Sequence, residues 1–416
     1  MSFASLGLEP ALLKALAELD YQDPTPIQAA AIPPALAGRD LLGQAATGSG
    51  KTLAFGLPLL QRVLQGGEGR RLRALVLAPT RELASQTAEA LRDLARLLPG
   101  RLKISVAFGG VSINPQLMGL RGGCDVMVAT PGRLLDLHAH NALGFEALEL
   151  LVLDEADRLL DMGFAEELQR ILALLPARRQ NLFFSATFPA AVQGLADSLL
   201  REPLRVEAPA ETPPDILQRA IRVDEAQRTP LLRHLLQTEG WSRLLVFVAT
   251  QYATELVSDK LWNAGIKAAA LHGELSQGTR REVLAALKAG TVQVLVATDV
   301  AARGLDIPEL PAVLNYDLPR SPADYTHRIG RTGRAGARGV ALSFVTATAE
   351  AHFRLIEKRQ GQRVPREQIA GFEPKEEPAQ APGTGGVKSL TRKSKKDKLR
   401  EAAAVTAAAS APKPRD

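Results

Sequence analysis

The stretch RALVLAPTRELASQTAEALRDLARLL, residues 73–98, shows the arrangement that decides the fold of this chain. Residues 73–79 are almost entirely apolar, whereas residues 80–98 show the mixed apolar and polar pattern of a helix. A strand that is apolar throughout is typical of a parallel sheet whose two faces are both covered by helices. The stretch therefore predicts a strand and a helix of an α/β fold.

Similar apolar runs recur along the chain, separated by helix-like stretches. The predicted strands are 73–79, 102–108, 125–130, 149–155, 181–187, 243–250, 266–273, 292–299, 312–317 and 339–345. The segment EAPAETPPDI, 207–216, separates the fifth strand from the sixth. It is rich in proline, polar and without periodicity, which is typical of an interdomain linker. We therefore expect two tandem α/β domains, 1–207 and 216–365, joined by a linker at 208–215.

The end of the chain has a different composition. In residues 371–386 Pro, Gly, Glu and Lys replace apolar residues, so we expect a disordered basic tail over residues 366–416. Residues 388–400 contain seven Lys/Arg and one Asp, so their net charge is +6. This equals the formal net charge of the whole chain. The body of the protein is therefore neutral overall, and any site for a polyanion there must be a local arrangement of charges.

The composition also excludes several protein classes. A single cysteine, Cys124, rules out an internal disulfide and fits a reducing compartment. The N-terminus MSFASLGLEP lacks the basic and apolar regions of a signal peptide. We find no uncharged apolar run long enough to span a membrane, so we expect no membrane association and a cytoplasmic location.

A glycine-rich turn in DLLGQAATGSGKT, 40–52, lies between a short apolar run and a helical pattern. Glycines allow backbone N–H groups to surround phosphate oxygens, Lys51 supplies a positive charge, and the Thr52 hydroxyl can reach Mg²⁺. Ala45 stands where the general phosphate-loop pattern has its first glycine. The alternative interpretation is a simple turn between a strand and a helix.

Three carboxylates follow the predicted strand in LVLDEAD, 151–157. Asp154, at the strand end, is suited to hold Mg²⁺, and Glu155 is suited to orient or deprotonate a water that attacks a γ-phosphate. Acidic residues at the start of a helix would also explain the pattern, through the helix dipole. Together with GSGKT, the sequence favours nucleotide hydrolysis.

The stretch HRIGRTGR, 327–334, contains three arginines far from the phosphate loop in sequence. Guanidinium groups suit a multiply charged oxyanion. A solvated basic loop or a site for RNA phosphates is the alternative, and Arg328 is open to either interpretation.

These motifs together resemble the DEAD-box ATP-dependent RNA helicases, and most closely their bacterial RhlE-like branch. DEAD stands literally at 154–157, and about ten ordered motifs match over roughly residues 3–350. The resemblance implies two RecA-like domains, with ATP and Mg²⁺ as ligands and Thr52 and Asp154 at the metal. Its implied nucleotide contacts are Phe3, Tyr21, Gln28, Thr47, Gly48, Ser49, Gly50, Lys51, Thr52, Gly304, Asp306, Arg331 and Arg334.

The resemblance also implies contacts to the RNA backbone that position a strand without reading its sequence. The implied RNA-binding residues are Pro79, Thr80, Arg81, Gly109, Gly110, Thr130, Pro131, Gly132, Arg133, Gln277, Arg280, Thr298 and Asp299. Residues implied to couple nucleotide state to RNA are Ser185, Ala186, Thr187, Asp157 and His327. The catalytic group would consist of Lys51, Asp154, Glu155, Arg331 and Arg334.

By this resemblance, Arg331 and Arg334 are arginine fingers that reach the γ-phosphate held by the other domain. The implied function is RNA-stimulated ATP hydrolysis coupled to local, non-processive duplex separation and remodelling of ribonucleoproteins. An RNA clamp with little unwinding and a non-catalytic RNA-binding scaffold are alternatives, and a DNA helicase is a weaker one. The basic tail is either an RNA tether or a solubilising segment. Ribosomal or mRNA-decay complexes are possible partners, and a monomer is the default expectation.

Overall fold

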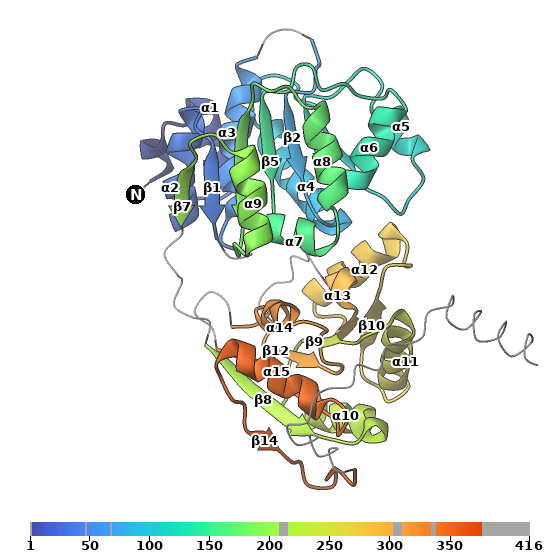
Figure 1. Ribbon diagram of the computed structural model, residues 1–416. Coiled ribbons are helices and arrows are strands. Elements are labelled where there is room, and N and C mark those ends of the chain that lie inside the picture. Colours follow the sequence, from blue (N-terminus) through green and yellow to red (C-terminus); the bar gives the residue numbers. More distant parts are fainter. Residues whose placement is uncertain are drawn as a thin grey trace, which may run out of the picture.

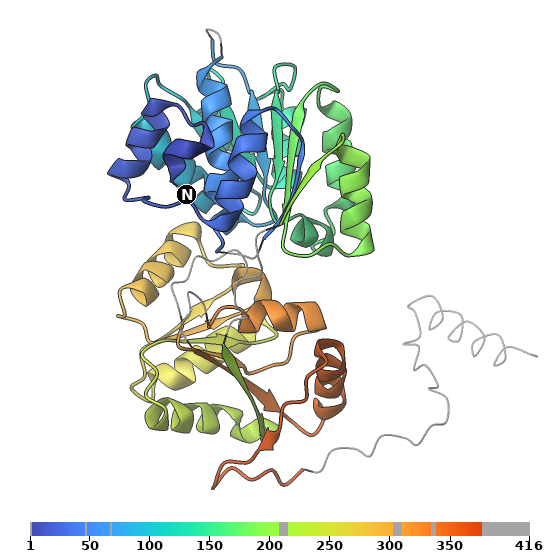
Figure 2. The same ribbon diagram turned by 90° about the vertical axis from the view of Figure 1, so that its left-hand side faces the viewer.

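The computed structural model describes residues 2–45, 48–66, 69–207, 215–302, 310–333 and 338–376. These residues form two seven-stranded sheets, each in its own domain, and Figures 1 and 2 show one domain stacked on the other. Every strand pair in both sheets is parallel. The predicted fold of two tandem parallel α/β sheets is therefore confirmed.

The first sheet has the strand order β3-β4-β2-β5-β6-β1-β7. Its strands are β1 (Leu41–Gln44), β2 (Ala74–Leu77), β3 (Ile104–Ala107), β4 (Val126–Ala129), β5 (Leu150–Leu153), β6 (Gln180–Ser185) and β7 (Leu204–Glu207). The helices are α1 (Pro10–Glu18), α2 (Pro26–Leu36), α3 (Lys51–Leu64), α4 (Arg81–Arg96), α5 (Asn114–Gly119), α6 (Pro131–Ala139), α7 (Ala156–Asp161), α8 (Ala165–Leu174) and α9 (Ala190–Leu199), preceded by a 3₁₀ turn, Phe3–Leu6. Helices α1–α4 pack on one face and α6–α9 on the other.

The second sheet has the strand order β10-β11-β9-β12-β13-β8-β14. Its strands are β8 (Ile216–Arg222), β9 (Leu244–Phe247), β10 (Ala268–Leu271), β11 (Val294–Ala297), β12 (Ala312–Asn315), β13 (Gly339–Val345) and β14 (Arg366–Glu367). The helices are α10 (Arg228–Thr238), α11 (Gln251–Trp262), α12 (Gln277–Lys288), α13 (Asp299–Ala302), α14 (Pro322–Ile329) and α15 (Glu350–Gln360), with a 3₁₀ turn at Glu225–Gln227. The two strand orders are identical when β1 is matched to β8 and each later strand in turn.

Burial on both faces explains why the strands are apolar throughout. In β2, Val76 belongs to the core on one face, whereas Leu75 and Leu77 belong to the core on the other. A strand with side chains alternating between two buried faces needs an apolar residue at every position. This continuous pattern made ten of the strands visible in the sequence.

Strands β1, β7, β8 and β14 were not among the ten predicted strands. The pattern of β8 is interrupted by polar residues, and the structure shows what satisfies them. Arg219 forms an ion pair of 2.7 Å with Glu367 on β14 and another of 2.7 Å with Glu239. Partners distant in the sequence thus make a polar strand stable, and a local pattern cannot reveal them.

The predicted start of the tail at residue 366 needs correction. Arg366 and Glu367 form β14 and pair with β8, and Ile369 and Phe372 pack against the core of the second domain. The ordered chain therefore extends to residue 376 at least, and residues 377–416 lie outside the described part. No helix in the described part is long and apolar enough to cross a membrane.

Candidate active site and nucleic-acid interface

The phosphate loop lies between β1 and α3. Gly48 and Gly50 have φ angles of 92° and 91°, a left-handed conformation that glycine adopts without strain. Helix α3 begins at Lys51, followed by Thr52, so the free N–H groups of its first turn are suited to bind an anion. The loop also contains Ser49, which is buried, and Thr47, which lies outside the described residues.

Among the buried polar atoms without a hydrogen-bond partner in the described part of the chain, two belong to residues predicted to bind the nucleotide or its metal ion. They are Nζ of Lys51, whose residue is 6% exposed, and Oδ1 of Asp154, whose residue is 2% exposed. Burial raises the pKa of Asp154 to about 6, although the positive charge of Lys51 opposes this shift. A buried polar group without a partner is costly, so this pair is suited to a polar ligand.

The residues here fit Mg²⁺ bound together with a nucleotide. Mg²⁺ is usually held by one or two carboxylates, substrate phosphates and water rather than by a cage of protein ligands. Asp154 supplies a carboxylate oxygen, and the Thr52 hydroxyl lies beside Lys51 on α3. The described residues contain no group of three or more His, Cys, Asp or Glu side chains that could hold a metal alone.

Glu155 has an unusual backbone conformation between β5 and α7. Its φ of 49° and ψ of 55° are left-handed, which is uncommon for a residue with a long side chain. The side chain is buried, and its Oε2 lies 3.4 Å from Nε of Arg158. Strained backbone that the surrounding structure holds in place is frequent at functional sites. The carboxylate of Glu155 lies close enough to Asp154 for its charge to help raise the pKa of Asp154.

The predicted coupling residues of the first domain are brought into contact. Oδ2 of Asp157 accepts hydrogen bonds from the Thr187 backbone N–H at 3.0 Å and from its hydroxyl at 2.8 Å. The Asp157 N–H donates to Oγ of Ser185 at 3.3 Å, and this hydroxyl donates to the Thr187 carbonyl at 2.7 Å. Ala186 lies between them in the chain. The start of α7 is therefore fixed to the end of β6.

Three predicted nucleotide contacts before the phosphate loop have different environments. Tyr21 is 42% exposed, as a stacking surface requires. Gln28 is buried; its Nε2 donates to the Gly50 carbonyl of the phosphate loop at 3.1 Å, and its Oε1 accepts from the Thr25 N–H. Phe3 is 4% exposed within the hydrophobic core, so its assignment as a nucleotide contact is corrected: its ring supports the fold.

The second domain brings α14 to the site. His327 lies close enough to Arg158 and Asp157 for their charges to influence it, and burial followed by Arg158 lowers the pKa of His327 to about 4. Arg331 is 5% exposed and lines a small pocket together with His327 and Arg158. The other predicted nucleotide contacts of this domain, Gly304, Asp306 and Arg334, lie outside the described residues.

Arg328 is bound entirely within the second domain. Its Nε and Nη2 donate to the two carboxylate oxygens of Asp299 at 2.6 and 2.7 Å, and its Nη1 donates to Asn315 at 3.0 Å. The Arg328 guanidinium is 3% exposed and stabilises the fold of its own domain. These contacts therefore favour neither a role at the γ-phosphate nor a solvated or RNA-binding role. Asp299, predicted to contact RNA, has both oxygens occupied by Arg328. The half-buried Thr298 beside it remains a predicted RNA contact.

The predicted RNA-binding residues of the first domain follow β2, β3 and β4, which are neighbours in the sheet. Carboxyl ends of parallel strands meet at one edge, so these three loops lie together. The loops contain Pro79, Thr80 and Arg81, then Gly109 and Gly110, then Thr130, Pro131, Gly132 and Arg133.

Side chains in these loops are partly used inside the protein. The Thr80 hydroxyl accepts from the Leu83 N–H and so caps α4, and Nη2 of Arg133 donates to the Val111 carbonyl at 2.7 Å. Arg81 lies against Gly110 and reaches the Gly273 carbonyl of the second domain at 3.2 Å. Backbone groups of the loops remain for a bound strand, and so do Nε and Nη1 of Arg133, which have no hydrogen-bond partner among the described residues.

Arg280, predicted to contact RNA, has a different role. Its Nη2 lies 2.7 Å from Oε1 of Glu82 in the first domain, and both side chains are buried, at 2% and 7% exposure. Burial lowers the pKa of Arg280, and Glu82 opposes the shift. The RNA assignment is corrected because the guanidinium lies inside the contact between domains. Gln277, at the start of α12, is half-buried and has no partner for Oε1 among the described residues.

Comparisons with known proteins agree with this arrangement. Residues 25–195 match the model of the DEAD/DEAH box helicases, and residues 227–336 match that of the helicase conserved C-terminal domain. The chain is 42% identical over 359 residues to the DEAD-box ATP-dependent RNA helicase CshA of Bacillus cereus, covering 86% of this chain and 68% of that protein. The chain belongs to the DEAD-box helicase family. It is an ATP-binding, ATP-dependent RNA helicase.

The domain arrangement of this DEAD-box helicase resembles one particular state of a solved relative. Saccharomyces cerevisiae Dbp5 bound to RNA and ADP BeF3 is 33% identical, matches 90% of this chain and 95% of its own, and gives a TM-score of 0.76. A variant of Dbp5 bound to Nup159, a Gle1 variant, IP6 and ADP is 31% identical. It matches 89% of this chain and 96% of its own, with a TM-score of 0.58. The described domains are thus more similar overall to the complex with RNA and ADP BeF3 than to the complex with Nup159, Gle1, IP6 and ADP.

Two residues at the junction of this DEAD-box helicase were missed from the sequence. Glu82 pairs with Arg280 across the domains, and Arg158 lies beside Glu155, His327 and the pocket near Arg331. Both stand within or next to recognised motifs, Glu82 in PTREL and Arg158 directly after DEAD. Their position was a signal, but their partners are distant in sequence, and only the folded arrangement identifies them.

Proposed function

We propose that ATP hydrolysis takes place in a site that is complete only when the two domains are in contact, and that RNA stimulates hydrolysis by favouring this contact. The observation that supports it is the position of His327 and Arg331 on the second domain, beside Arg158 and Asp157 of the first. Two ligands that stabilise the same closed state must promote each other's binding.

The proposed roles in the first domain follow from the geometry. Lys51 and the N–H groups at the start of α3 bind the β- and γ-phosphates. Asp154 and the Thr52 hydroxyl hold Mg²⁺, which supplies positive charge to the phosphate oxygens when it is bound. Glu155 orients the attacking water and accepts its proton. Gln28 and Tyr21 recognise adenine.

The second domain supplies the remaining charge. Arg331 and Arg334 stabilise the negative charge that spreads over the phosphoryl oxygens, an effect worth roughly 10³–10⁵ in rate for arginine fingers. Gly304 and Asp306 contact the ribose. Because the arginines and the phosphate loop belong to different domains, hydrolysis stops when the domains separate.

We further propose local, non-processive strand separation. The loops after β2, β3 and β4, together with Gln277 and Thr298, bind the backbone of one strand without reading its sequence. The finer proposals rest on the sequence motifs: membership of the RhlE-like branch, a cytoplasmic location, and action on ribonucleoproteins such as ribosomal or mRNA-decay complexes. The loops supply backbone groups rather than base-specific side chains, which supports action on varied RNAs.

Steady-state ATP hydrolysis tests the proposal. The intact chain is assayed without nucleic acid, with a single-stranded RNA and with DNA of the same sequence, and Lys51→Ala is the blank. We expect strong stimulation by RNA, weak stimulation by DNA, and loss of hydrolysis in Arg331→Ala and Arg334→Ala with ATP affinity retained. Equal hydrolysis with and without RNA would show that the site is complete without RNA, contrary to the proposal.

A strand-displacement assay under the same conditions separates the two catalytic alternatives. Release of a short duplex strand that depends on ATP supports local unwinding. RNA-stimulated hydrolysis without strand release would identify an RNA clamp.

A further inference from the structure

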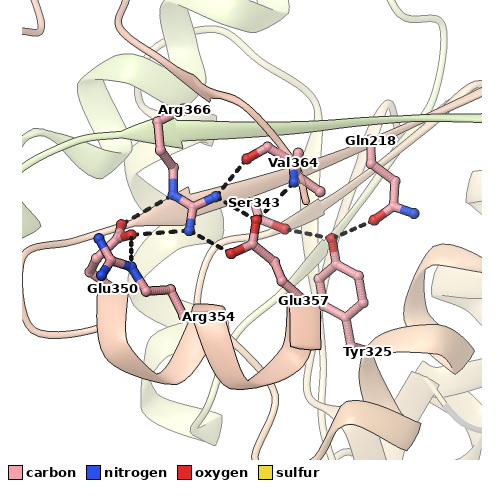
Figure 3. Close-up of polar contacts among 8 residues, drawn as sticks. All are labelled: Gln218, Tyr325, Ser343, Glu350, Arg354, Glu357, Val364 and Arg366. Atoms are coloured by element: carbon pink, nitrogen blue, oxygen red, sulfur yellow. Dashed lines mark hydrogen bonds and ion pairs between the residues drawn. The ribbon is translucent and has the colours of Figure 1, made fainter. Parts of the chain in front are cut away.

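The far side of α14 is held by a cluster of charged residues that the proposed mechanism does not use. Arg366 on β14 lies between Glu350 and Glu357, which both belong to α15 (Figure 3). Its Nε and Nη2 donate to Glu350, each at 3.1 Å, and its Nη1 and Nη2 donate to Glu357, each at 2.9 Å. Nη1 also donates to the Val364 carbonyl at 2.6 Å, so all three guanidinium nitrogens are engaged.

The cluster continues through two aromatic rings to α14. The guanidinium carbon of Arg366 lies 4.6 Å from the centre of the Phe353 ring. The centres of the Phe353 and Tyr325 rings are 5.9 Å apart, with an angle of 66° between the rings, an edge-to-face contact. Tyr325 is 1% exposed and lies on α14 two residues before His327. Arg366 is therefore connected by packing to the helix that carries His327.

The hydroxyl of Tyr325 joins α14 to the sheet. It donates to Oε1 of Gln218 on β8 at 3.2 Å and accepts from Oγ of Ser343 on β13 at 3.4 Å (Figure 3). Oγ of Ser343 in turn accepts from Nδ2 of Asn315 on β12 at 3.1 Å. Asn315 is fully buried, and its Oδ1 accepts from Arg328, so the chain of bonds returns to α14.

The network therefore fixes α14 at two points along its length, Tyr325 and Arg328. His327 lies between these points, and Arg331 follows α14 within a turn. A rigid helix held at two points has a defined rotation and tilt, whereas packing by apolar residues alone tolerates small shifts. A displacement of about 1 Å in a group that stabilises a transition state can cost on the order of 10²-fold in rate.

We propose that Tyr325 and Arg366 are positioning residues for the second-domain half of the active site. Arg366 holds α15 and its Phe353 against the back of Tyr325, and the Tyr325 hydroxyl sets the orientation of α14 on the sheet. Neither side chain touches the pocket that contains His327 and Arg331. The last strand of the domain thus helps to place the arginine of the catalytic site. This inference rests on the proposed role of Arg331 in hydrolysis.

The test compares two variants with a matched control in the intact chain. Tyr325→Phe removes only the hydroxyl, and Arg366→Met removes the charge while keeping an unbranched side chain. Arg354→Met is the control, because Arg354 also donates to Glu350, at 3.0 Å, but its side chain is 68% exposed. RNA-stimulated kcat, the KM for ATP and the Tm are measured for each, with the kinetics well below the lowest Tm.

We expect kcat to fall about five- to tenfold in Tyr325→Phe and Arg366→Met, the size expected when a buried hydrogen bond that holds a functional element is lost. The KM for ATP should change less than about twofold, because the first domain binds the nucleotide in the open state. Arg354→Met should keep the wild-type kcat. If Arg366→Met does not fold, Arg366→Lys replaces it, since lysine keeps the charge but cannot bridge both carboxylates as a fork.

Unchanged kcat in both variants, with or without a lower Tm, would overturn the inference, because the network would then serve stability alone. A fall in kcat equal to that of Arg354→Met would overturn it as well. Arg331→Ala separates this failure from failure of the proposed function. If Arg331→Ala hydrolyses ATP at the wild-type rate, the proposed role of the second domain is wrong; if it is inactive while Tyr325→Phe is normal, only the positioning role is wrong.

Discussion

Each domain has a basic residue at the start of the helix after its first strand and an acidic residue shortly after a matching strand, but the two pairs make different contacts. In the first domain, Lys51 begins the helix after β1 and Asp154 follows β5. In the second, Arg228 begins the helix after β8, and Asp317 follows β12, the strand that matches β5. Lys51 Nζ and Asp154 Oδ1 have no hydrogen-bond partner in the described part of the chain, whereas Nη1 of Arg228 lies 2.5 Å from Oδ1 of Asp317.

The difference shows that the same strand order can place a charged pair in a ligand-binding site or in an ion pair that stabilises the domain. In the second domain the other oxygen of Asp317 accepts from the Ala249 N–H at 2.8 Å, so the carboxylate is satisfied by the protein. In the first domain Lys51 Nζ and Asp154 Oδ1 have no hydrogen-bond partner among the described residues, and a nucleotide with its metal ion can satisfy them. The different contacts of these two pairs, rather than the shared topology, distinguish the domain suited to bind the phosphates.

The largest expected effect is at Glu155 in the first domain. Glu155→Gln keeps the size and burial of the side chain but removes its ability to accept a proton. Turnover should fall about 10³-fold, within the usual range for loss of a general base. Affinities for ATP and RNA, measured by equilibrium binding, should remain at wild-type values. An unchanged turnover number would remove Glu155 from the role of base.

Much of the first domain could be predicted from the sequence because its signals are local. The strand at β2 is a continuous apolar run, and the glycines, Lys51 and Thr52 of the phosphate loop are adjacent in the chain. Asp154 and Glu155 could be assigned for the same reason. Each of these features is decided by neighbours within a few residues.

What could not be predicted depends on partners that are distant in sequence. Strand β8 is polar because Arg219 pairs with Glu239 and Glu367, and the domain continues past residue 365 because Arg366 pairs with α15. Arg280 was predicted to contact RNA from its resemblance to a family motif, yet it forms a buried ion pair with Glu82 of the other domain. A guanidinium can bind a phosphate or a carboxylate, and only the folded chain shows which one it meets.

The second prediction tests whether the two domains act as a pair. Arg280→Met leaves Glu82 buried without its partner when the domains are in contact, a loss of about 3 kcal/mol, or on the order of 100-fold in the closing equilibrium. RNA-stimulated hydrolysis should fall accordingly, while ATP binding to the first domain remains. Arg281→Met is the control, because Arg281 lies 3.8 Å from Glu89 in an exposed pair. Similar activity of the two variants would contradict a role for the buried pair in closure.

The third prediction compares the two carboxylates directly. Asp317→Asn breaks the ion pair with Arg228 and should lower the free energy of unfolding of the second domain by about 2 kcal/mol, since hydrogen bonds to charged groups are lost. Asp154→Asn removes a buried charge whose Oδ1 has no hydrogen-bond partner in the described part of the chain, so the first domain should keep or gain stability at pH 7.5. Chemical denaturation measures both. Equal destabilisation would show that Asp154 is satisfied by the protein, contrary to the comparison.

The pH dependence of the free energy of unfolding provides a second comparison of Asp154→Asn with Asp317→Asn. The pKa of Asp154 is raised to about 6 by burial, above its ordinary value of 3.8. The protonated form is therefore favoured in the folded protein, and its stabilising contribution is lost as pH rises from about 4 through 6. Asp154→Asn should remove this part of the pH dependence, and Asp317→Asn should retain it.

The smallest expected effect is a pH dependence of domain closure through His327. Burial and then Arg158 lower the pKa of His327 to about 4, while Asp157, Asp324 and Glu155 oppose the shift. When the domains separate, the imidazole should regain a pKa near 6.5. The closed state then binds fewer protons, so its stability is full above about pH 6.5 and decreases as pH falls towards 4. The RNA concentration for half-maximal stimulation should rise roughly tenfold between pH 7.5 and 5.5.

His327→Gln separates this titration from other effects of pH on hydrolysis. Glutamine offers a hydrogen-bonding side chain that does not titrate, so the variant should need the same RNA concentration at both pH values. His140→Gln is the control, because His140 is exposed on the first domain, and it should retain the wild-type dependence. A tenfold dependence that persists in His327→Gln would assign the titration to another group. If only His140→Gln retains it, a proton on α14 opposes closure, as expected for a half-buried imidazole that lies near Arg158 at the domain contact.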